Sequence, residues 1–334
     1  MIRRLTIIAL LATGVWGGYW VVGSIALERG LRAWVSDRQG EGWVADYTEL
    51  TVRGFPNRFD TTFTDLDLAD PETGLAWSLP FFQILALSYK PNHVIAVWPD
   101  THRISTPAER LTVTSDKMQA SLVVEPGTDL VLDRATLVAE VFGVSSTQGW
   151  TSGAASLSVA SRQVEGAAHS HDIAIEATDV IIADPLRAAL DPLRALPGEV
   201  KTLRLLAKVS FDGPWDRFAL EQARPQPTGI DITDLTALWG DLELRAAGQL
   251  DVSDTGQASG EITVKAVNWK DMLDVAVAAG VLPEATRQTA ENALGLLAGL
   301  SGRADTIDAP LAIRNNLVFF GPIPLGQIDP IRLP

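Results

Sequence analysis

The sequence predicts a mainly β fold of the α+β class, in which an N-terminal transmembrane helix leads into an elongated, curved antiparallel β-sheet that forms a groove or half-barrel with a few covering helices. Three observations support this fold class. One uncharged run stands at the N-terminus, apolar and polar residues alternate over much of the remaining chain, and helical periodicity is confined to a few short segments.

The uncharged run extends from Leu5 to Leu27 and follows two arginines. A helix rises about 1.5 Å per residue, so the run reaches roughly 34 Å and can cross a hydrocarbon core of about 30 Å. We predict that residues 1–27 form a membrane anchor or uncleaved signal. A cleaved signal peptide is the alternative, but its apolar core usually has only about 7 to 15 residues. The predicted anchor residues are Arg3, Arg4 and the interfacial aromatic side chains Trp16, Tyr19 and Trp20.

The chain after the run is predicted to fold as one large β-rich region. Residues 28–42 are interpreted as a helical linker that ends near Gly40 and Gly42, and residues 43–334 as the β-rich domain. A division of this domain into two sub-parts, 43–183 and 198–334, is left open, with a short helical segment at 184–197 joining them.

Strand patterns are clearest in the C-terminal half. From Asp241 to Val252 apolar residues alternate with polar ones, which is typical of a half-buried strand. Ser253-Asp254-Thr255-Gly256 is turn chemistry, and alternation resumes from Glu261 to Ala266, so we predict a hairpin. The segment Leu203–Phe211 is a further strand of the same type. Shorter signals, spaced as in an antiparallel meander, occur at 111–114, 120–124, 130–132, 135–141, 155–159 and 173–177.

Few helices are available to cover such a sheet. The segments Asp184-Pro185-Leu186-Arg187 and Asp191-Pro192-Leu193-Arg194 each offer an Asp for the N-cap and a Pro for the first helical position. A helical pair is predicted further on, where Asn268 caps a helix over 269–279, Gly280 closes it and Pro283 opens the second helix.

Composition excludes several classes of function. The net charge is −14, whereas nucleic acids and anionic surfaces require clustered Lys and Arg, so we expect no nucleic-acid partner. The absence of cysteine excludes disulfides, thiol catalysis and Cys-based metal sites. The sequence has no glycine-rich phosphate loop or dinucleotide fingerprint, and we therefore expect no cofactor.

The histidines do not form a convincing site. His169 and His171 stand two residues apart in a strand near two acidic residues, but we interpret them as a solvent-exposed pair instead of metal ligands. His93 and His102 flank Trp98-Pro99-Asp100 without a nucleophile beside them. We therefore predict no catalytic or metal-binding histidine.

The acidic and serine candidates are equally weak. Asp65, Asp67 and Asp70 alternate before a turn, but they lack the Gly and Glu spacing of a calcium loop, so an acidic, solvated strand edge is predicted. Ser259 lies in a predicted hairpin and lacks the flanking pattern of a nucleophile elbow. A hydrolase using Asp65 or Asp100 is consequently the weakest functional hypothesis.

The two ends of the body carry a family resemblance. Gly42-Trp43 and Gly54-Phe55-Pro56-Asn57-Arg58 at the start, and Ala309-Pro310-Leu311 with Phe319-Phe320-Gly321-Pro322-Ile323-Pro324-Leu325 at the end, resemble the uncharacterised DUF2125 family of Gram-negative bacterial proteins. Asn315-Asn316 stands where such endings often carry Asp-Gly or Asn-Gly, and a tight hairpin is expected there. The architecture is also distantly similar to AsmA-like envelope proteins, which are β-groove proteins linked to lipid movement.

The resemblance and the anchor together imply a non-enzymatic protein of the cell envelope. We expect a single-pass protein of the inner membrane, with its body in the periplasm, that binds or handles membrane lipids through an apolar β-groove. The alternative is a structural or scaffolding module with a closed core that binds envelope proteins. The predicted groove residues are Leu203, Leu205, Val209, Leu242, Leu244, Ile262 and Val264.

Overall fold

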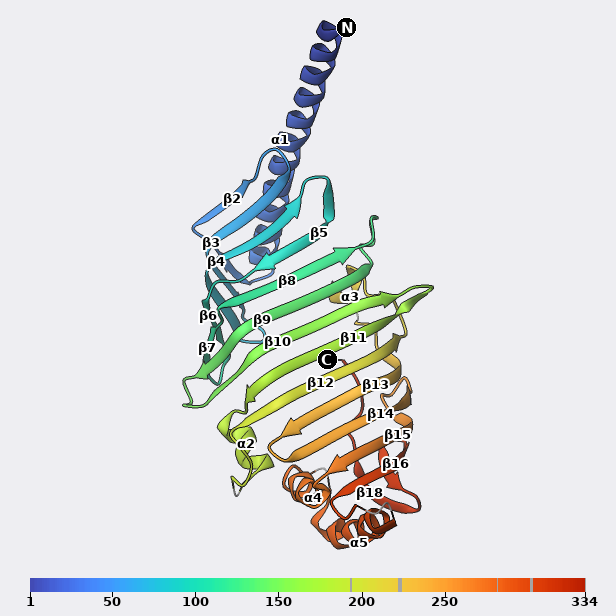
Figure 1. Ribbon diagram of the computed structural model, residues 1–334. Helices are drawn as coiled ribbons and strands as arrows, with labels where there is room; N and C mark the ends of the chain where they lie inside the picture. Colours follow the sequence, from blue (N-terminus) through green and yellow to red (C-terminus); the bar gives the residue numbers. More distant parts are fainter. Residues whose placement is uncertain (193, 222–223, 281, 301–302, 334) are drawn as a thin grey trace. The chain divides into compact units, whose positions relative to one another are not determined.

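The computed structural model describes residues 1–192, 194–221, 224–280, 282–300 and 303–333 (Figure 1). Strands make up 52% of the described residues, which confirms the mainly β class with a large antiparallel sheet and an apolar N-terminal helix. Two compact units are defined by their internal packing. Unit 1 comprises residues 1–124 and 137–149, and unit 2 comprises residues 125–136 and 150–334, so the helical segment 184–197 lies inside unit 2.

The N-terminal helix α1 runs without a break from Ile2 to Gly40. Its apolar part is long enough to cross a membrane, and no residue of that window is buried. The predicted linker is therefore the last part of the same helix, and it ends at Gly40 as expected. Leu31 and Val35 in this part pack into the core of unit 1, so the segment is a packed element of that unit.

Unit 1 contains β1 to β8 and residues 137–146 of β9, all antiparallel where they pair. Strand β4 is shared between two branches, since Ala76–Ser78 pair with β6 and Gln83–Leu87 pair with β5. Pro80, which has no N–H to donate, lies between these two pairings. The strands are β1 Val44–Asp46, β2 Glu49–Arg53, β3 Arg58–Asp70, β4 Leu75–Leu87, β5 Lys90–Val97, β6 Thr101–Ser105, β7 Arg110–Thr114, β8 Lys117–Val124 and β9 Leu132–Ser146.

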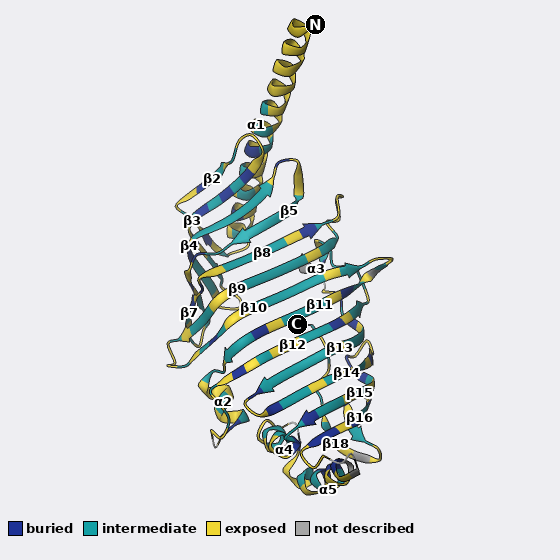
Figure 2. Cartoon of the chain, in the orientation of Figure 1, coloured by how far each residue is buried: buried dark blue, intermediate teal, exposed yellow. Residues whose placement is uncertain are grey.

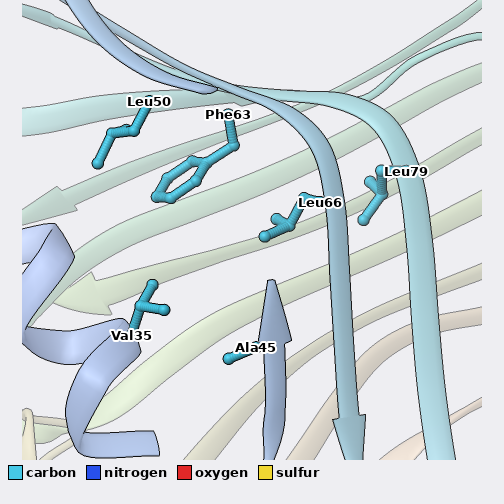
Figure 3. Close-up of a cluster of buried hydrophobic side chains, with 6 residues drawn as sticks. All are labelled: Val35, Ala45, Leu50, Phe63, Leu66 and Leu79. Atoms are coloured by element: carbon cyan, nitrogen blue, oxygen red, sulfur yellow. The ribbon is translucent and has the colours of Figure 1, made fainter. Parts of the chain in front are cut away.

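The core of unit 1 lies between α1 and the first strands (Figure 3). Val35 comes from the helix, Ala45 from β1 and Leu50 from β2, and each is at most 4% exposed. Phe63, Leu66 and Leu79 complete the cluster from β3 and β4. The helix therefore covers this side of the sheet with its own apolar residues.

Unit 2 is a meander in which each strand from β10 to β18 pairs antiparallel with the next. The strands are β10 Thr151–Val164, β11 Ala167–Ile181, β12 Glu199–Phe211, β13 Pro227–Trp239, β14 Leu242–Val252, β15 Ala258–Val267, β16 Thr306–Arg314, β17 Leu317–Phe320 and β18 Ile323–Gln327. The helices are α2 Asp184–Leu190, α3 Phe218–Glu221, α4 Trp269–Ala278 and α5 Glu284–Leu300.

The predicted turns form as expected. The Ser253–Gly256 turn joins β14 to β15, with the Ser253 N–H donating to the Gln257 carbonyl at 2.9 Å. Asn315 and Asn316 both have positive φ, at 48° and 68°, which is the requirement of a type I′ hairpin. The Asn316 side chain is 3% exposed, and its Oδ1 accepts a 2.6 Å bond from the Ala258 N–H.

Two local predictions for helices are corrected. The second Asp-Pro-Leu-Arg segment does not start a helix, because the Asp191 carboxylate accepts bonds from the Ala195 and Leu196 N–H groups and holds a turn; Leu193 lies outside the described residues. Asn268 precedes α4 as predicted, but it does not cap the helix with its side chain. It adopts a left-handed conformation, and its Nδ2 donates to the Asp241 carbonyl at 2.7 Å.

Candidate ligand-binding face

The strands of unit 2 place their apolar residues on one face. Residues paired across an antiparallel sheet point to the same side, so the register defines rows of neighbouring side chains. One row crosses the sheet at mid-strand and consists of Val159, Ile175, Leu205, Leu235, Ala246, Val264 and Ala309. A parallel row consists of Leu157, Ala177, Leu203, Ala237, Leu244, Ala266 and Ile307. We call the side that carries these rows the apolar face.

A β-bulge in β13 keeps the apolar face continuous. The alternation in this strand changes phase between Ile232 and Leu235, where two polar residues follow each other. The register shifts at the same place, since Ala207 pairs with Ile232 whereas Leu205 pairs with Leu235. A bulge inserts an extra residue and so returns the next apolar side chain to the original face. Both halves of β13 thus contribute to one surface.

Two glycines on the apolar face bring β14 and β15 close together. A Cβ on Gly248 would lie 2.2 Å from the Glu261 carbonyl oxygen, and one on Gly260 would lie 2.0 Å from the Gln249 carbonyl oxygen. These positions accept no larger residue without a shift of the backbone. Glycine within a strand often marks such a close approach of two backbones.

Helices α4 and α5 cover the C-terminal part of the apolar face. Trp269 is 2% exposed and packs with Leu294 and Ala298 from α5 and with Ala266 and Ile307 from the sheet. Its Nε1 donates to the Ala304 carbonyl at 3.1 Å. This end of the sheet is therefore a closed apolar core.

The C-terminal tail covers the strand ends on the same face. Ile328 and Ile331 pack against a cluster that includes Leu250 and Ile313. The Ile331 N–H donates to the Gly256 carbonyl at 2.8 Å, and Leu333 exchanges hydrogen bonds with the Gln226 side chain. The tail thus passes along the turns at one end of the strands.

The apolar face of β10 to β13 lacks such a cover. Among the described residues, no helix packs against these four strands as α4 and α5 pack against β14, β16 and β18. Most of their residues have intermediate burial (Figure 2), and Leu203 is 38% exposed. A row of large apolar side chains with partial access to solvent is a surface that an apolar ligand can occupy.

A pocket lies at the edge of this face, between the chain after α2 and helix α4. Its volume is about 510 Å³, within the range of roughly 300 to 1,000 Å³ that is typical of ligand sites. Leu242 lines it together with Leu196, Pro197 and Val275, and it is also a member of the apolar face. The carboxylates of Asp271 and Asp274 lie at the same pocket, and Asp274 pairs with Arg287.

His171 lies on the apolar face, at the end of a row of apolar side chains. It is 1% exposed, its Nδ1 lies 3.0 Å from Ser161 Oγ, and its ring contacts Phe211. Burial lowers the pKa of the His171 imidazole below its ordinary value, while the nearby Asp172 carboxylate opposes this shift. The prediction of a solvent-exposed pair is wrong for His171, because its strand position faces the apolar side, and right for His169, which is exposed.

The other face of the same strands is charged. Arg204 pairs with Glu176 at 3.0 Å and with Asp234 at 3.6 Å, and these side chains come from three neighbouring strands. A hollow of about 510 Å³ on this side is lined by residues that include Arg162 and Lys208. Unit 2 therefore presents two faces of opposite character.

The seven predicted groove residues share the apolar face. Leu242 is buried, Leu203 is exposed and the other five have intermediate burial. The sequence reasoning missed the contributions of β10, β11 and β13. The alternation at 155–159 and 173–177 could have identified the apolar residues of β10 and β11. In β13 the phase change interrupts the alternation, so its apolar residues could not be assigned to one face. The missed residues are Leu157, Val159, Ile173, Ile175, Ile230, Ile232 and Leu235.

The predicted anchor residues lie along α1. Arg3 and Arg4 are exposed at its start. The aromatic residues donate hydrogen bonds to backbone carbonyls of unit 1, from Trp16 Nε1 to Pro56 at 3.0 Å, from Tyr19 Oη to Ser88 at 2.5 Å and from Trp20 Nε1 to Arg58 at 2.7 Å. The second half of the predicted span is thus attached to strand turns.

The residues of the hydrolase hypothesis, Asp65 and Asp100, do not form one site. Asp65 and His102 line one hollow of about 470 Å³ in unit 1, and Asp100 does not line it. Asp65 Oδ2 accepts a bond from Thr48 Oγ1 at 3.1 Å, whereas the His102 ring packs against Trp77. Burial lowers the pKa of His102. His93 Nε2 lies 2.9 Å from Ser121 Oγ. Asp65 and His102 therefore contact different partners.

These features define a mainly β protein that combines a long apolar N-terminal helix with an antiparallel sheet bearing one apolar face. A family model described as an uncharacterized protein conserved in bacteria, DUF2125, matches residues 20–329. The chain belongs to this family, as the sequence motifs predicted. The comparisons with curated proteins and with solved structures gave no match.

Proposed function

We propose that the chain is a non-enzymatic protein of the cell envelope, anchored in the inner membrane by α1 with its body in the periplasm, and that it binds lipid acyl chains on the apolar face of β10 to β13. The observation that carries the proposal is the row of apolar side chains across these strands, against which no described helix packs as α4 and α5 pack against β14 and β16. The distant similarity to AsmA-like proteins, drawn from the sequence, agrees with it.

The chemistry of the face suits an acyl chain. The central rows contain aliphatic residues, and their ionisable neighbours point to the other side of the sheet, as the Arg204 ion pairs illustrate. Removing a methylene from water contributes about 0.8 kcal/mol, so an acyl chain of ordinary length supplies several kcal/mol without any specific polar contact. Binding would therefore depend on apolar area and tolerate variation in the chain.

The pocket beside Leu242 offers a place for the end of such a ligand. It joins the apolar face at Leu242, and its remaining lining combines aliphatic side chains with carboxylates. An apolar ligand portion can lie on the strands while a polar portion meets water at the pocket edge. This arrangement follows the general pattern of ligand sites, which are mainly apolar with a few polar groups.

Two neighbouring leucines of β12 provide a matched test. Leu205 points to the apolar face and Leu206 to the charged face, and both have intermediate burial. The full chain and the variants Leu205→Glu and Leu206→Glu would be incorporated into liposomes that contain a photoactivatable phospholipid. We expect crosslinks within residues 151–239 of the wild-type chain. These crosslinks should fall several-fold in Leu205→Glu and remain in Leu206→Glu.

Crosslinks confined to α1 would contradict the proposal, since they report only the lipid around an anchor. An equal loss in both variants would also contradict it, because the effect would then not depend on the apolar face. If the strands crosslinked to proteins of a native membrane and never to lipid, the alternative scaffolding function would gain support.

A further inference from the structure

Two turns of unit 1 contact α1 and carry exposed aromatic residues. One turn joins β2 to β3 and contains Gly54-Phe55-Pro56-Asn57, and the other joins β4 to β5 at Ser88-Tyr89. Phe55 is 60% exposed and Tyr89 is 62% exposed, although both are large aromatic residues. We refer to these two segments as the aromatic turns.

The aromatic turns pack beside the middle of the helix. Trp20 contacts the Phe55 ring edge-on, with centroids 5.4 Å apart, and stacks on Phe59 at 6.1 Å. Tyr19 contacts Phe59 from the same helix turn at 6.4 Å. The helix approaches so closely that a Cβ on Gly23 would lie 2.8 Å from the Phe59 ring. The helix, the β2–β3 turn and the start of β3 thus form one aromatic cluster.

The length of the free helix shows where this cluster lies if α1 spans a membrane. Between Leu5 and Val15 the helix rises only about 16 Å, whereas the hydrocarbon core is about 30 Å thick. A span that starts after Arg4 therefore has to reach approximately Ser24, which is on the far side of the cluster. The turns attached at Trp16 and Trp20 then lie at the depth of the outer leaflet.

The hydrogen bonds of the aromatic turns suit an environment with little water. Pro56, Arg58 and Ser88 offer their carbonyls to side chains of the helix, as described above. The carbonyls of Gly54 and Asn57 accept bonds from the N–H groups of Arg58 and Ser88, both at 2.8 Å. A loop in contact with lipid must satisfy its backbone polar groups internally, whereas a loop in water need not.

Charged residues begin immediately behind the turns. Arg53 precedes Gly54, Lys90 follows Tyr89, and Arg58 is paired with Asp60 at 3.0 Å. Lys and Arg side chains extend their charged ends towards headgroups from positions near a membrane surface. Exposed aromatic rings in front of basic residues form the pattern of a membrane interface.

We propose that the aromatic turns are a second membrane-contacting element, in which Phe55 and Tyr89 enter the outer leaflet of the bilayer that α1 spans and thereby hold unit 1 against the lipid surface. The inference rests on the proposed anchoring of α1, and it is independent of ligand binding on the apolar face. The partner is the phospholipid bilayer itself, and the contact holds unit 1 at the lipid surface through the turns as well as through α1.

Single cysteines can test the depth of each segment, because the chain contains no cysteine of its own. Full-length variants Phe55→Cys and Tyr89→Cys would carry an environment-sensitive fluorophore in liposomes of phosphatidylethanolamine and phosphatidylglycerol. Lipids with a spin label on the acyl chain quench fluorophores within the hydrocarbon region. Tyr89 makes no ring contact with the cluster among the described residues, so its replacement leaves the cluster in place.

The controls come from the same unit. Val15→Cys on the free part of α1 reports whether the helix is in the bilayer, since it is 74% exposed. Leu75→Cys is the matched negative control, because it is 49% exposed and lies at the other end of β4 from Leu87, roughly 40 Å along the strand. We expect strong quenching at Val15, Phe55 and Tyr89, several-fold greater than at Leu75.

Quenching at Val15 with no more at Tyr89 than at Leu75 would overturn the inference and leave the anchor intact. Absence of quenching at Val15 would overturn both, because a helix outside the bilayer cannot bring the turns to it. Quenching at Tyr89 in a variant that also carries Leu205→Glu would show that the contact does not depend on the proposed ligand site.

Discussion

The two units treat the apolar side of a sheet in different ways. In unit 1 the sheet packs against α1, and the residues at the contact are almost completely buried, with Val35 at 4% and Ala45 at 0% exposure. In unit 2 the helices α4 and α5 cover only the last strands, and no described helix packs comparably against β10 to β13. The same alternating pattern therefore serves a closed core in one case and an accessible surface in the other.

This difference shows that an apolar strand face does not by itself define a hydrophobic core. Burial depends on whether another apolar element is available nearby in the chain. Unit 1 obtains such an element from the end of α1, which precedes β1 directly. In unit 2 the connections between β10 and β13 contain only the short helices α2 and α3 among the described residues, and α2 has no buried residue among its seven.

The largest expected effect concerns the closed end of unit 2. Trp269→Ala removes a side chain that is 2% exposed from the core between α4, α5 and the sheet, and it should lower the free energy of unfolding by about 3 to 5 kcal/mol. The control Leu203→Ala, on the uncovered part of the same face, should cost about 1 kcal/mol or less. Urea denaturation in detergent, followed by circular dichroism, measures both. Equal losses would mean that β10 to β13 are as well covered as β14 to β16.

A smaller effect is expected from the glycine contacts that shape the sheet. Gly248→Ala places a Cβ against the Glu261 carbonyl oxygen and should destabilise the chain by about 1 to 3 kcal/mol, because the two strands must move apart. Gly229→Ala on the neighbouring β13 is the control, since the nearest atom would be 3.8 Å from its Cβ. Thermal melting of the two variants compares them. A stable Gly248→Ala chain would show that the close approach of β14 and β15 is not required.

The smallest effect concerns the pH dependence of stability. The pKa of His171 is lowered by burial, so the unfolded chain binds a proton more readily than the folded chain, and stability falls as the pH drops below the ordinary value for histidine. His171→Gln removes this contribution and should reduce the loss between about pH 7 and pH 5. His169→Gln, at the exposed position two residues earlier, should leave the loss unchanged. Identical profiles of stability against pH for both variants would exclude His171 as a contributor. The buried His102 contributes a part of the pH dependence that neither variant alters.

Local chemistry was predictable wherever neighbouring residues decide the conformation. The Ser253–Gly256 turn, the Asn315-Asn316 hairpin and the end of α1 near Gly40 all follow from the preferences of the residues in place. The predicted groove residues also share a face, because alternation alone assigns sides within an unbroken strand.

Other features required the fold. The bulge in β13 depends on its pairing with β12 and β14, and the sequence alone indicated no strand in this segment because its alternation changes phase. Asn268 donates to the Asp241 carbonyl, which lies 27 residues earlier, and helix signals in the sequence do not report such a partner. His171 is buried because its row ends beneath Phe211, which lies forty residues further along the chain.

The sequence by itself determined the fold class, the apolar N-terminal helix, the strands with clear alternation and the family, because these depend on composition and on periodicities within short segments. Only the tertiary structure decided which apolar surfaces are covered and where the second half of α1 lies. Both depend on contacts between residues distant in the chain, such as Trp16 with Pro56 and Trp269 with Ile307. Periodicity gives the side of a strand, whereas coverage requires knowing what packs against it.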